Sequence, residues 1–345
     1  MTQAQNNLAI GENLPPPVAL FQMASGYWIS QAIYVAARLG IADLLKDGPM
    51  SYLELAEATA THPASLRRLL RALAGLGVLA TEQNYAFELT PIGASLRSTS
   101  LTSIRSMVLA LGEEHYHAWG ELLRGIRSGE PAFNHVYGMD LFTYLGRTPT
   151  ARMTFNEGMA EVTSLVSIAL LASYDFSVFT KIVEVGGGYG SLIKAILMAN
   201  PTVSGVLFDA PQIIDGAKAY ISNGELNGRC KAIGGNFFDS VPPGGDAYIL
   251  KNVIHDWDDS KSVAILRNCR QAMAENGRVL LVEMLLPLEG AASLQSLMDL
   301  NMLVISTGRE RTEPEYREIL GAAGLRITRI VPTLSPYNLI EAVRF

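Results

Sequence analysis

The chain has 345 residues, 49% of them hydrophobic, and a formal net charge of −6 at neutral pH. This length can bury a large core and favours two domains, or one domain with a substantial extension. The negative charge disfavours a nucleic-acid partner, because phosphate binding normally needs a basic face. With two cysteines, no secretory pattern and no apolar run long enough to cross a bilayer, we expect a soluble, cytoplasmic protein that does not contact a membrane.

The N-terminal part has the pattern of a winged-helix domain. We expect a long apolar helix over 18–45, a short helix opened by a capping box of Ser51 with Glu54, and a third helix with leucines at helical spacing. Two short apolar segments, 76–79 and 85–89, predict a β-hairpin. Because the first helix is apolar around most of its circumference, we expect a second subunit to cover part of it, which makes the protein a homodimer.

A winged helix also raises the alternative of a DNA-binding regulator that senses a ligand. Between residues 50 and 100, however, four arginines are balanced by four glutamates. They are Arg67, Arg68, Arg71 and Arg97, and Glu54, Glu57, Glu82 and Glu88. A neutral wing is a poor phosphate clamp, so a dimerising role is favoured over DNA binding.

The next segment, 101–179, is helical in pattern and rich in aromatic residues. We expect it to connect the two domains and to line part of a substrate pocket. Its histidines, His115, His117 and His135, lack a convergent third ligand, so a place in the pocket wall or on the surface is favoured over a metal site. No metal is expected.

The remaining chain, 180–345, alternates strands and helices. Seven candidate strands are 181–185, 203–208, 229–233, 246–250, 278–283, 325–331 and 338–344. Candidate helices are 190–199, 211–220, 259–274, 291–306 and 313–323. This alternation implies an α/β fold with a largely parallel sheet, and the last two strands, which no helix separates, should pair antiparallel.

A glycine-rich turn follows the first of these strands. An apolar run containing Glu184 opens into glycines at Gly186, Gly188 and Gly190, which would let the backbone approach a ligand closely. A dinucleotide fingerprint needs glycine at the sixth position, which is Ser191 here, so NAD fits poorly. The pattern E-x-G-x-G-x-G resembles motif I of the S-adenosylmethionine (SAM) dependent methyltransferases.

The second strand ends in Asp209, about 20 residues past the glycines, where doubly wound folds place an acid against ribose hydroxyls. The alternative is a helix cap before Pro211. We expect Glu184 and Asp209 to face one ligand crevice.

Three residues at the ends of later strands could carry chemistry. His255 lies just past the fourth strand, Glu283 ends the fifth, and Glu310 lies in the loop 307–312. Imidazole, with an ordinary pKa of roughly 6.5, is a suitable general base, and a carboxylate can select its tautomer. A structural role is the alternative for a lone histidine, but two acids in equivalent positions favour catalysis.

These segments resemble a known family. His255-Asp256-Trp257, Val282-Glu283-Met284-Leu285-Leu286-Pro287 and Gly308-Arg309-Glu310-Arg311-Thr312 are similar to motifs of the plant-type small-molecule O-methyltransferases, the caffeic acid O-methyltransferase family and its bacterial natural-product relatives. The resemblance covers nearly the whole chain. It implies a winged-helix dimerisation domain over 1–100, a connector over 101–179, and over 180–345 a Rossmann-like SAM-methyltransferase sheet of seven strands.

The resemblance also implies the site. His255 would deprotonate the acceptor hydroxyl, with Glu283 and Glu310 orienting it. The expected SAM contacts are Glu184 and Gly186, Gly188 and Asp209 on the ribose side, Asn236 and Phe237 near the adenine, and Lys251. The pocket candidates are Phe155, Met159, Trp257 and Met302. Tyr189 and Asn236 depart from the family pattern, which commonly has Thr or Ser and an acid; Tyr189 could crowd the cofactor or turn away.

We therefore predict methyl transfer from SAM to a hydroxyl of an aromatic small molecule, by in-line displacement at the sulfonium methyl group. The alternatives are N- or C-methylation or a non-methylating reaction on the same fold, and the DNA-binding regulator described above.

Overall fold

The computed structural model describes residues 14–81, 86–221, 226, 228–290 and 293–345. The chain divides into two compact units, Met1–Glu114 and His115–Phe345. The expected connector is thereby split. Its first helix, α7 (Arg105–Ala110), belongs to the first unit, where Arg105 Nε donates to the carbonyl of Ala37 at 3.2 Å. This contact joins residues 68 positions apart, so no local sequence pattern could predict which unit α7 belongs to.

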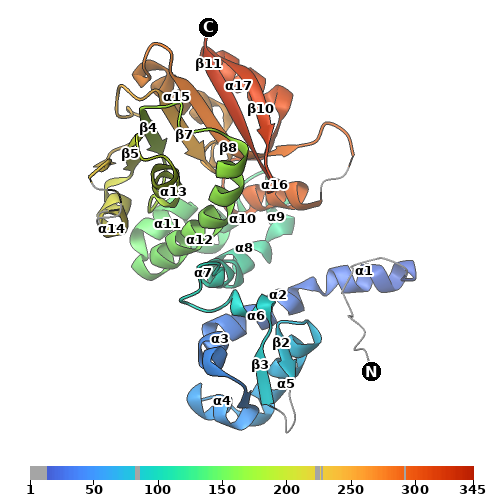
Figure 1. Ribbon diagram of the computed structural model, residues 1–345. Coiled ribbons are helices and arrows are strands. Elements are labelled where there is room, and N and C mark those ends of the chain that lie inside the picture. Colours follow the sequence, from blue (N-terminus) through green and yellow to red (C-terminus); the bar gives the residue numbers. More distant parts are fainter. Residues whose placement is uncertain (1–13, 82–85, 222–225, 227, 291–292) are drawn as a thin grey trace. The chain divides into compact units, whose positions relative to one another are not determined.

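The winged-helix layout of the first unit is confirmed (Figure 1). Its elements after the first helices are β1 (Met50–Ser51), α4 (Tyr52–Ala58), α5 (Pro63–Gly75), β2 (Leu79–Thr81) and β3 (Ala86–Leu89). The capping box of Ser51 with Glu54 opens α4, and β2 and β3 pair antiparallel as predicted, with β1 added beside β3. Of the charges weighed above, Glu82 lies outside the described residues.

The single helix expected over 18–45 is wrong. The structure has α1 (Pro16–Ala24), α2 (Gly26–Arg38) and α3 (Ile41–Leu44) in its place. The first helix ends at Ser25, whose backbone leaves helical geometry at φ −89° and ψ 5°, and Gly40 interrupts the second with φ 67°. Left-handed glycine is a common helix terminator, and here it overrides a continuous apolar pattern.

The second unit begins with five helices: α8 (Tyr116–Trp119), α9 (Leu122–Ser128), α10 (Ala132–Tyr137), α11 (Leu141–Arg147) and α12 (Pro149–Ser173). They build a small core with residues of a later helix, α16 (Ser293–Ile305), around buried Phe133, Leu145 and Met302. Within the described part of the chain, no helix combines the length and the apolar character that crossing a bilayer requires.

All seven predicted strands are confirmed, with ends that shift by a few residues. They are β4 (Lys181–Val185), β5 (Ser204–Asp209), β6 (Cys230–Gly234), β7 (Ala247–Lys251), β8 (Arg278–Leu286), β10 (Leu325–Pro332) and β11 (Tyr337–Arg344). The order across the sheet is β10-β11-β8-β7-β4-β5-β6, and a short strand, β9 (Arg311–Thr312), pairs with β8. The last two strands pair antiparallel as expected, and β11 also runs antiparallel to β8, while the other neighbours are parallel.

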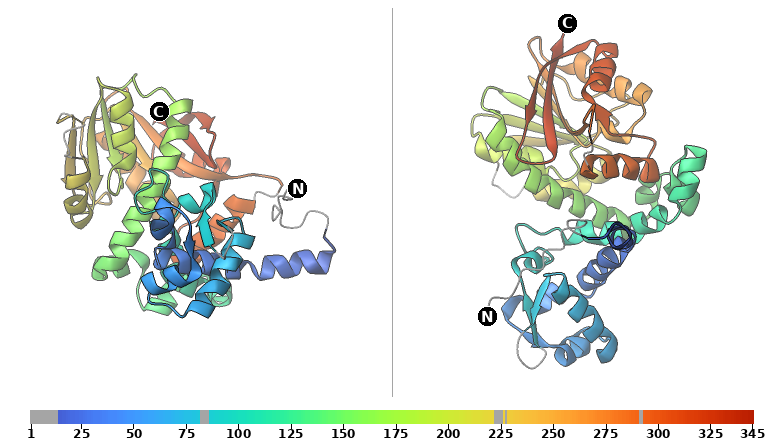
Figure 2. Two further views of the ribbon diagram at one scale, coloured as in Figure 1. Left: turned by 60° about the horizontal axis from the view of Figure 1, so that its bottom comes forward. Right: turned by 90° about the vertical axis from the view of Figure 1, so that its right-hand side faces the viewer.

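Helices cover both faces of this sheet (Figure 2). The helices between the strands are α13 (Ser191–Ala199), α14 (Pro211–Ile221), α15 (Asp259–Ala272), α16 and α17 (Glu313–Ala322). One buried cluster holds side chains of α12, α13 and α14 against the sheet, and the other holds those of α15 and α17. Strand residues alternate between the two clusters, as Ile182 and Val183 do, so the parallel strands read as nearly continuous apolar runs.

A buried carboxylate ties the edge strands of the sheet to the end of α12. Glu341 on β11 accepts hydrogen bonds from Tyr174 Oη (2.6 Å), Thr328 Oγ1 (2.7 Å), Arg278 Nη1 (2.9 Å) and Arg329 Nη2 (3.0 Å). Burial opposes the charged form, but these donors outweigh it and lower the pKa of Glu341 from 4.5 to about 2.

Replacing Glu341 with Gln is expected to lower the free energy of unfolding by about 1–3 kcal/mol at pH 7, because four donors lose a charged acceptor. Since the folded pKa is the lower one, this contribution is present above pH 4.5 and is lost as the pH falls towards 2. Urea unfolding of both proteins between pH 7 and 3 checks it. A difference in stability that stayed constant over this range would contradict the assignment.

Candidate active site

The predicted site residues meet at one edge of the sheet because β4, β7 and β8 are parallel neighbours. Glu184 lies opposite Ile249, and Lys251 lies opposite Val282. The glycine turn after β4, the turn after β7 and Glu283 on β8 are therefore adjacent. This is the edge at which open α/β sheets bind ligands.

The glycine turn is shaped for close approach to a ligand. Gly186 and Gly188 have φ of 70° and 58°, in the left-handed region. A Cβ on Gly186 would lie 2.7 Å from Val253 Cγ2, whereas a Cβ on Gly188 would meet no protein atom within 4 Å. Position 188 therefore faces open space, as a cofactor cradle requires.

The acids beside this turn lie at different depths. Asp209 accepts from the amide of Gly188 at 2.7 Å and from that of Ala210 at 2.6 Å, and burial raises its pKa. Glu184 is 2% exposed and accepts from Ile193 N at 3.1 Å; burial raises its pKa to about 8. A Cβ on Gly187 would lie 2.6 Å from Glu184 Cδ. The turn therefore covers Glu184, which supports it from behind. The expected contact of Glu184 with the cofactor stays a prediction.

The adenine-side candidates differ from one another. Asn236 is exposed, and its Oδ1 accepts from Phe238 N at 3.1 Å while its Nδ2 donates to Asp239 at 3.1 Å. Its amide oxygen thus closes an Asx turn, and this competes with the expected bond to adenine. Phe237 packs edge-on against Trp257 at 6.1 Å, and its ring lies beside Gly186, with a Cβ there 3.8 Å from Phe237 Cε1.

Tyr189 turns away from the glycine turn. Its ring lies against α14, where a Cβ on Gly216 would be 3.0 Å from Tyr189 Cε1. Of the two alternatives for this departure from the family pattern, crowding or turning away, the structure has the second.

Lys251 presents a buried ammonium group to this edge. Its Nζ has no hydrogen-bond partner among the described residues and lies 5.2 Å from the centre of the Tyr337 ring. Burial lowers the pKa of Lys251 to about 8, although Glu283, Glu184 and Asp256 raise it. A buried ammonium without a partner is unfavourable, so a polar ligand atom at this place would be stabilised.

The turn after β7, which we call the catalytic turn because it carries the predicted base, holds His255 between two glutamates. His255 lies in a short 3₁₀ segment (Ile254–Asp256) and is 5% exposed. Its Nδ1 is 2.8 Å from Glu310 Oε1 and 3.8 Å from Glu283 Oε2. Glu283 Oε1 accepts from Ile254 N at 3.0 Å, so this glutamate also holds the turn itself. The structure thus brings together the three residues predicted from sequence to be catalytic.

The carboxylates set the protonation of the ring. Burial alone would lower the pKa of His255, but Glu283, Asp256 and Glu310 outweigh it and raise the pKa to about 10. Burial raises the pKa of Glu283 to about 7 and that of Asp256 to about 6. The free Nε2 makes no hydrogen bond to a described residue, and it lies 3.7 Å from Asp256 Oδ1.

Comparison with known proteins places this site in a family. The chain matches an O-methyltransferase domain over residues 119–326 and an O-methyltransferase dimerisation domain over residues 21–99. The chain belongs to the SAM-dependent O-methyltransferases. The resemblance inferred from the motifs is confirmed, as is the Rossmann-like methyltransferase sheet with an N-terminal dimerisation domain.

Individual relatives agree along nearly their full lengths. The phenazine O-methyltransferase PhzM of Lysobacter antibioticus is 41% identical, over 95% of this chain and 96% of the relative. The phenazine-1-carboxylate N-methyltransferase of Pseudomonas aeruginosa is 34% identical, over 98% and 99%. The crystal structure of human N-acetylserotonin methyltransferase in complex with SAM has 30% identity and a TM-score of 0.91, covering 97% of this chain and 99% of that one. The cofactor of the O-methyltransferase described by this sequence is therefore SAM.

The open space at Gly188 and the unpartnered Nζ of Lys251 fit that cofactor. The expectation that no metal takes part in this O-methyltransferase stays a prediction, because His255, Glu283 and Glu310 lie within 4.8 Å of one another, close enough to share an ion.

The four pocket candidates of the O-methyltransferase lie in two places. Trp257 stacks on Phe142 at 5.5 Å, near the catalytic turn. Phe155 stacks on His115 at 6.3 Å and packs against the cluster that contains buried Met302, while Met159 is half-buried on α12. Two cavities lie elsewhere, one of about 350 Å³ beside 285–288 and one of about 290 Å³ in the first unit, and none of the four candidates lines them.

Sequence reasoning missed three residues that support the predicted catalytic group of His255, Glu283 and Glu310. Asp256 adds a third carboxylate beside His255, Asp299 accepts from the backbone amide of Glu310 at 3.0 Å, and Arg311 binds the catalytic turn. Asp256 and Arg311 stand next to predicted catalytic residues in the motifs, which was the available signal. Asp299 comes from the middle of α16, and no local pattern marks it.

Proposed function

We propose that this O-methyltransferase methylates a hydroxyl of an aromatic small molecule, phenolic or polyketide-like, with His255 as the general base. One observation carries the proposal: Nδ1 of His255 is held at 2.8 Å by Glu310, which leaves Nε2 to face an acceptor. When bound, SAM supplies a methyl group made electrophilic by its sulfonium. The chain must supply the proton acceptor, the alignment and a dry site.

The proton of the acceptor hydroxyl passes to Nε2 as its oxygen attacks the methyl group in line with the sulfur. A phenol has a pKa near 10, as for tyrosine, so a base with an ordinary imidazole pKa removes its proton only in small part. The carboxylates around His255 raise its pKa to about 10 and stabilise the imidazolium that forms. The pKa of the base is thereby close to that of a phenolic acceptor. The imidazolium of the free enzyme must, however, lose its own proton before His255 can accept one.

Binding of the cofactor would use Gly186, Gly188 and Asp209 at the ribose, Asn236 and Phe237 at the adenine, and Lys251 between them and the catalytic turn. Glu184 would act by supporting the glycine turn. The acceptor would lie among Phe155, Met159, Trp257 and Met302, whose apolar and polarisable side chains suit a flat ring.

Incubation with methyl-labelled SAM and a panel of phenols tests the reaction, with product detection by mass spectrometry. Each phenol should be paired with the aniline of the same shape. We expect a labelled methyl ether from at least one phenol, and the same yield in excess EDTA because no metal is needed. Labelled product from anilines alone would contradict O-methylation, and loss of product in EDTA would contradict the metal-free site.

N-methylation is the second candidate, because one relative is named an N-methyltransferase. A neutral ring nitrogen carries its own lone pair and needs no base before attack. Turnover of such an acceptor should therefore survive loss of His255, which separates this candidate from O-methylation. No observation favours C-methylation or a non-methylating reaction over these two.

We also propose a homodimer, which the dimerisation domain over residues 21–99 supports. The first two helices expose large apolar side chains that a monomer would leave in water. They are Val18, Leu20, Phe21, Met23, Tyr27, Trp28 and Val35, exposed by 37–67%.

Light scattering at micromolar concentration should give about twice the subunit mass of 37.3 kDa. Replacing Phe21 and Trp28 together with Asp should shift the mass towards one subunit, since their edge-to-face pair, with centroids 6.0 Å apart, lies on this exposed face. A wild-type protein that stays monomeric would contradict the dimer.

Two expectations stay predictions: that the protein has no nucleic-acid partner, and that it is cytoplasmic. A gel shift with random duplex at low salt tests the first, since the arginines of α5 would give a retarded band if the wing bound phosphates.

A further inference from the structure

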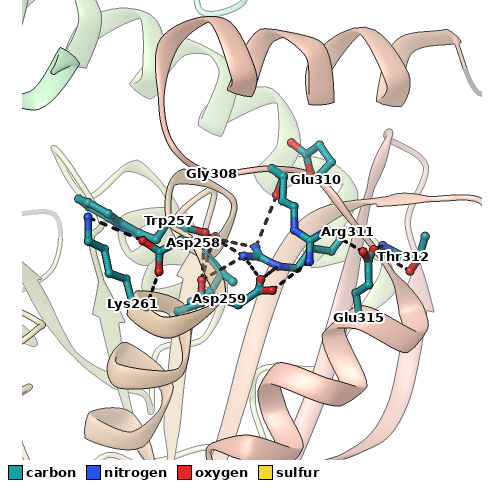
Figure 3. Close-up of polar contacts among 12 residues, drawn as sticks. Trp257, Asp258, Asp259, Lys261, Gly308, Glu310, Arg311, Thr312 and Glu315 are labelled. Carbon is teal, nitrogen blue, oxygen red and sulfur yellow. Dashed lines mark hydrogen bonds and ion pairs between the residues drawn. The ribbon is translucent and has the colours of Figure 1, made fainter. Parts of the chain in front are cut away.

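An arginine next to Glu310 is completely buried against the catalytic turn. The side chain of Arg311 is 0% exposed. Its Nη1 donates to the carbonyl of Ile254 at 3.1 Å and its Nη2 to that of Trp257 at 2.8 Å. These two carbonyls stand on either side of the dipeptide His255-Asp256, so one guanidinium spans the turn that carries the proposed base. Figure 3 shows Arg311 beside Trp257 and Asp259.

The same guanidinium reaches the start of the helix that follows this turn. Its Nε and Nη2 donate to Asp259 Oδ1 at 3.0 and 2.8 Å, and Nη2 also reaches Ser262 Oγ at 3.3 Å. Each of its nitrogens therefore has an acceptor. A planar fork of five N–H donors can meet this set of acceptors, whereas a lysine ammonium, with three donors on one atom, cannot.

The backbone on the other side of Arg311 carries Glu310. Arg311 pairs with Leu285 through β9 and β8, and the amide of Glu310 donates to Asp299 Oδ1 at 3.0 Å. A Cβ on Gly308 would collide with the His255 carbonyl and with Asp256, so the two segments already touch through their backbones. The loop 307–312 and the catalytic turn are thus held together at two points, Gly308 and the guanidinium.

We propose that Arg311 is a positioning residue, which locks the turn carrying His255 to the loop carrying Glu310 and so sets the 2.8 Å contact between Nδ1 and Oε1. This rests on the proposed function, in which His255 is the base. Without the guanidinium, the carbonyls of Ile254 and Trp257 lose their donors, and the ring is free to move relative to Glu310. A displacement near 1 Å at a reacting group is enough to cost about 100-fold in rate.

The test compares Arg311→Lys with Arg309→Lys. Arg309 is a matched control because its Nη2 binds the same aspartate, at Oδ2 and 3.0 Å, while its side chain is 46% exposed and is bonded to Glu315 rather than to the catalytic turn. We expect Arg311→Lys to lower kcat by about 10- to 100-fold with SAM affinity unchanged, and Arg309→Lys to stay within about 2-fold of wild type. Equal effects of the two variants, or none from Arg311→Lys, would overturn the proposal.

A second readout does not depend on turnover. The chain has five histidines, so ¹⁵N-histidine labelling gives few signals, and His255 is identified by its loss in His255→Gln. In wild type its ring should titrate at alkaline pH. In Arg311→Lys the midpoint should fall and the Nδ1 signal of the bonded tautomer should broaden. A merely structural arginine would lower thermal stability and leave this titration unchanged, which would overturn the positioning role.

If Arg311→Lys does not fold, Asp259→Asn carries the same test, because Asp259 is 51% exposed and its loss leaves the carbonyl contacts of Arg311 in place. It should lower kcat by a smaller factor and shift the His255 titration in the same direction; an unchanged titration would overturn the proposal. If Arg311→Lys shifts the titration of His255 as expected while His255→Ala keeps wild-type turnover, the positioning role of Arg311 is supported and the proposed base is not.

Discussion

Replacing His255 with Ala is expected to lower turnover of a phenolic acceptor by roughly 10²–10⁴-fold, the usual contribution of a positioned general base. SAM affinity should stay close to wild type, because the cofactor contacts proposed for Gly186, Gly188 and Asp209 do not involve the ring. Single-turnover kinetics and calorimetric titration with SAM measure the two quantities separately. Wild-type turnover in this variant would mean that catalysis rests on proximity alone, and the mechanism would have to be abandoned.

The acidity of the acceptor provides the sharpest control. A phenol that is already ionised at the assay pH needs no base, so the loss in His255→Ala should shrink as more acidic phenols are used, and raising the pH should partly rescue the variant on ordinary phenols. Glu283→Gln and Glu310→Gln should each cost less than His255→Ala, because one carboxylate still orients the ring.

The wild-type pH profile follows from the same cluster. Since the pKa of His255 is raised to about 10, the ring of the free enzyme is protonated at pH 7 and can accept a proton only after losing one. Turnover should therefore rise with pH above 7 and level off near the pKa of the ring. A profile that is flat from pH 6 upward would contradict the raised pKa.

Replacing Gly188 with Val is expected to abolish measurable SAM binding while the fold survives. The new Cβ would enter the open space at the glycine turn, which we assign to the cofactor, and the φ of 58° is unfavourable for a branched side chain. The matched control is Gly129→Val, since Gly129 has φ 72° and equally open surroundings but ends α9. It carries the same backbone strain without touching the proposed cofactor site.

Calorimetry with SAM and S-adenosylhomocysteine, together with thermal unfolding, checks this pair. Both variants should lose a similar, small amount of stability, of the order of 1–2 kcal/mol from the left-handed backbone. Only Gly188→Val should lose SAM. Wild-type affinity in Gly188→Val would show that the cofactor binds elsewhere, and equal loss in Gly129→Val would show that strain alone is responsible.

The sequence by itself determined the strands of the sheet and which polar side chains meet at its edge. Apolar runs bounded by turn residues marked all seven strands, and parallel strands must bring their carboxyl ends to one edge. That rule predicted that His255 and Glu283 would meet, and the resemblance to the family motifs added Glu310, which lies 55 positions after His255. The capping box of Ser51 with Glu54 was equally readable, because both partners lie within one turn of helix.

Only the tertiary structure decided how each polar group is used. Glu184 reads like a ligand-facing acid, yet the turn folds over it and the start of α13 takes its carboxylate. Asn236 reads like an adenine contact, yet its amide oxygen closes its own turn. Arg311 carries no distinctive pattern, and its role comes from acceptors on another loop more than 50 positions away. Local sequence sets which elements form, but a hydrogen-bonding group pairs with whatever the packed chain brings within about 3 Å.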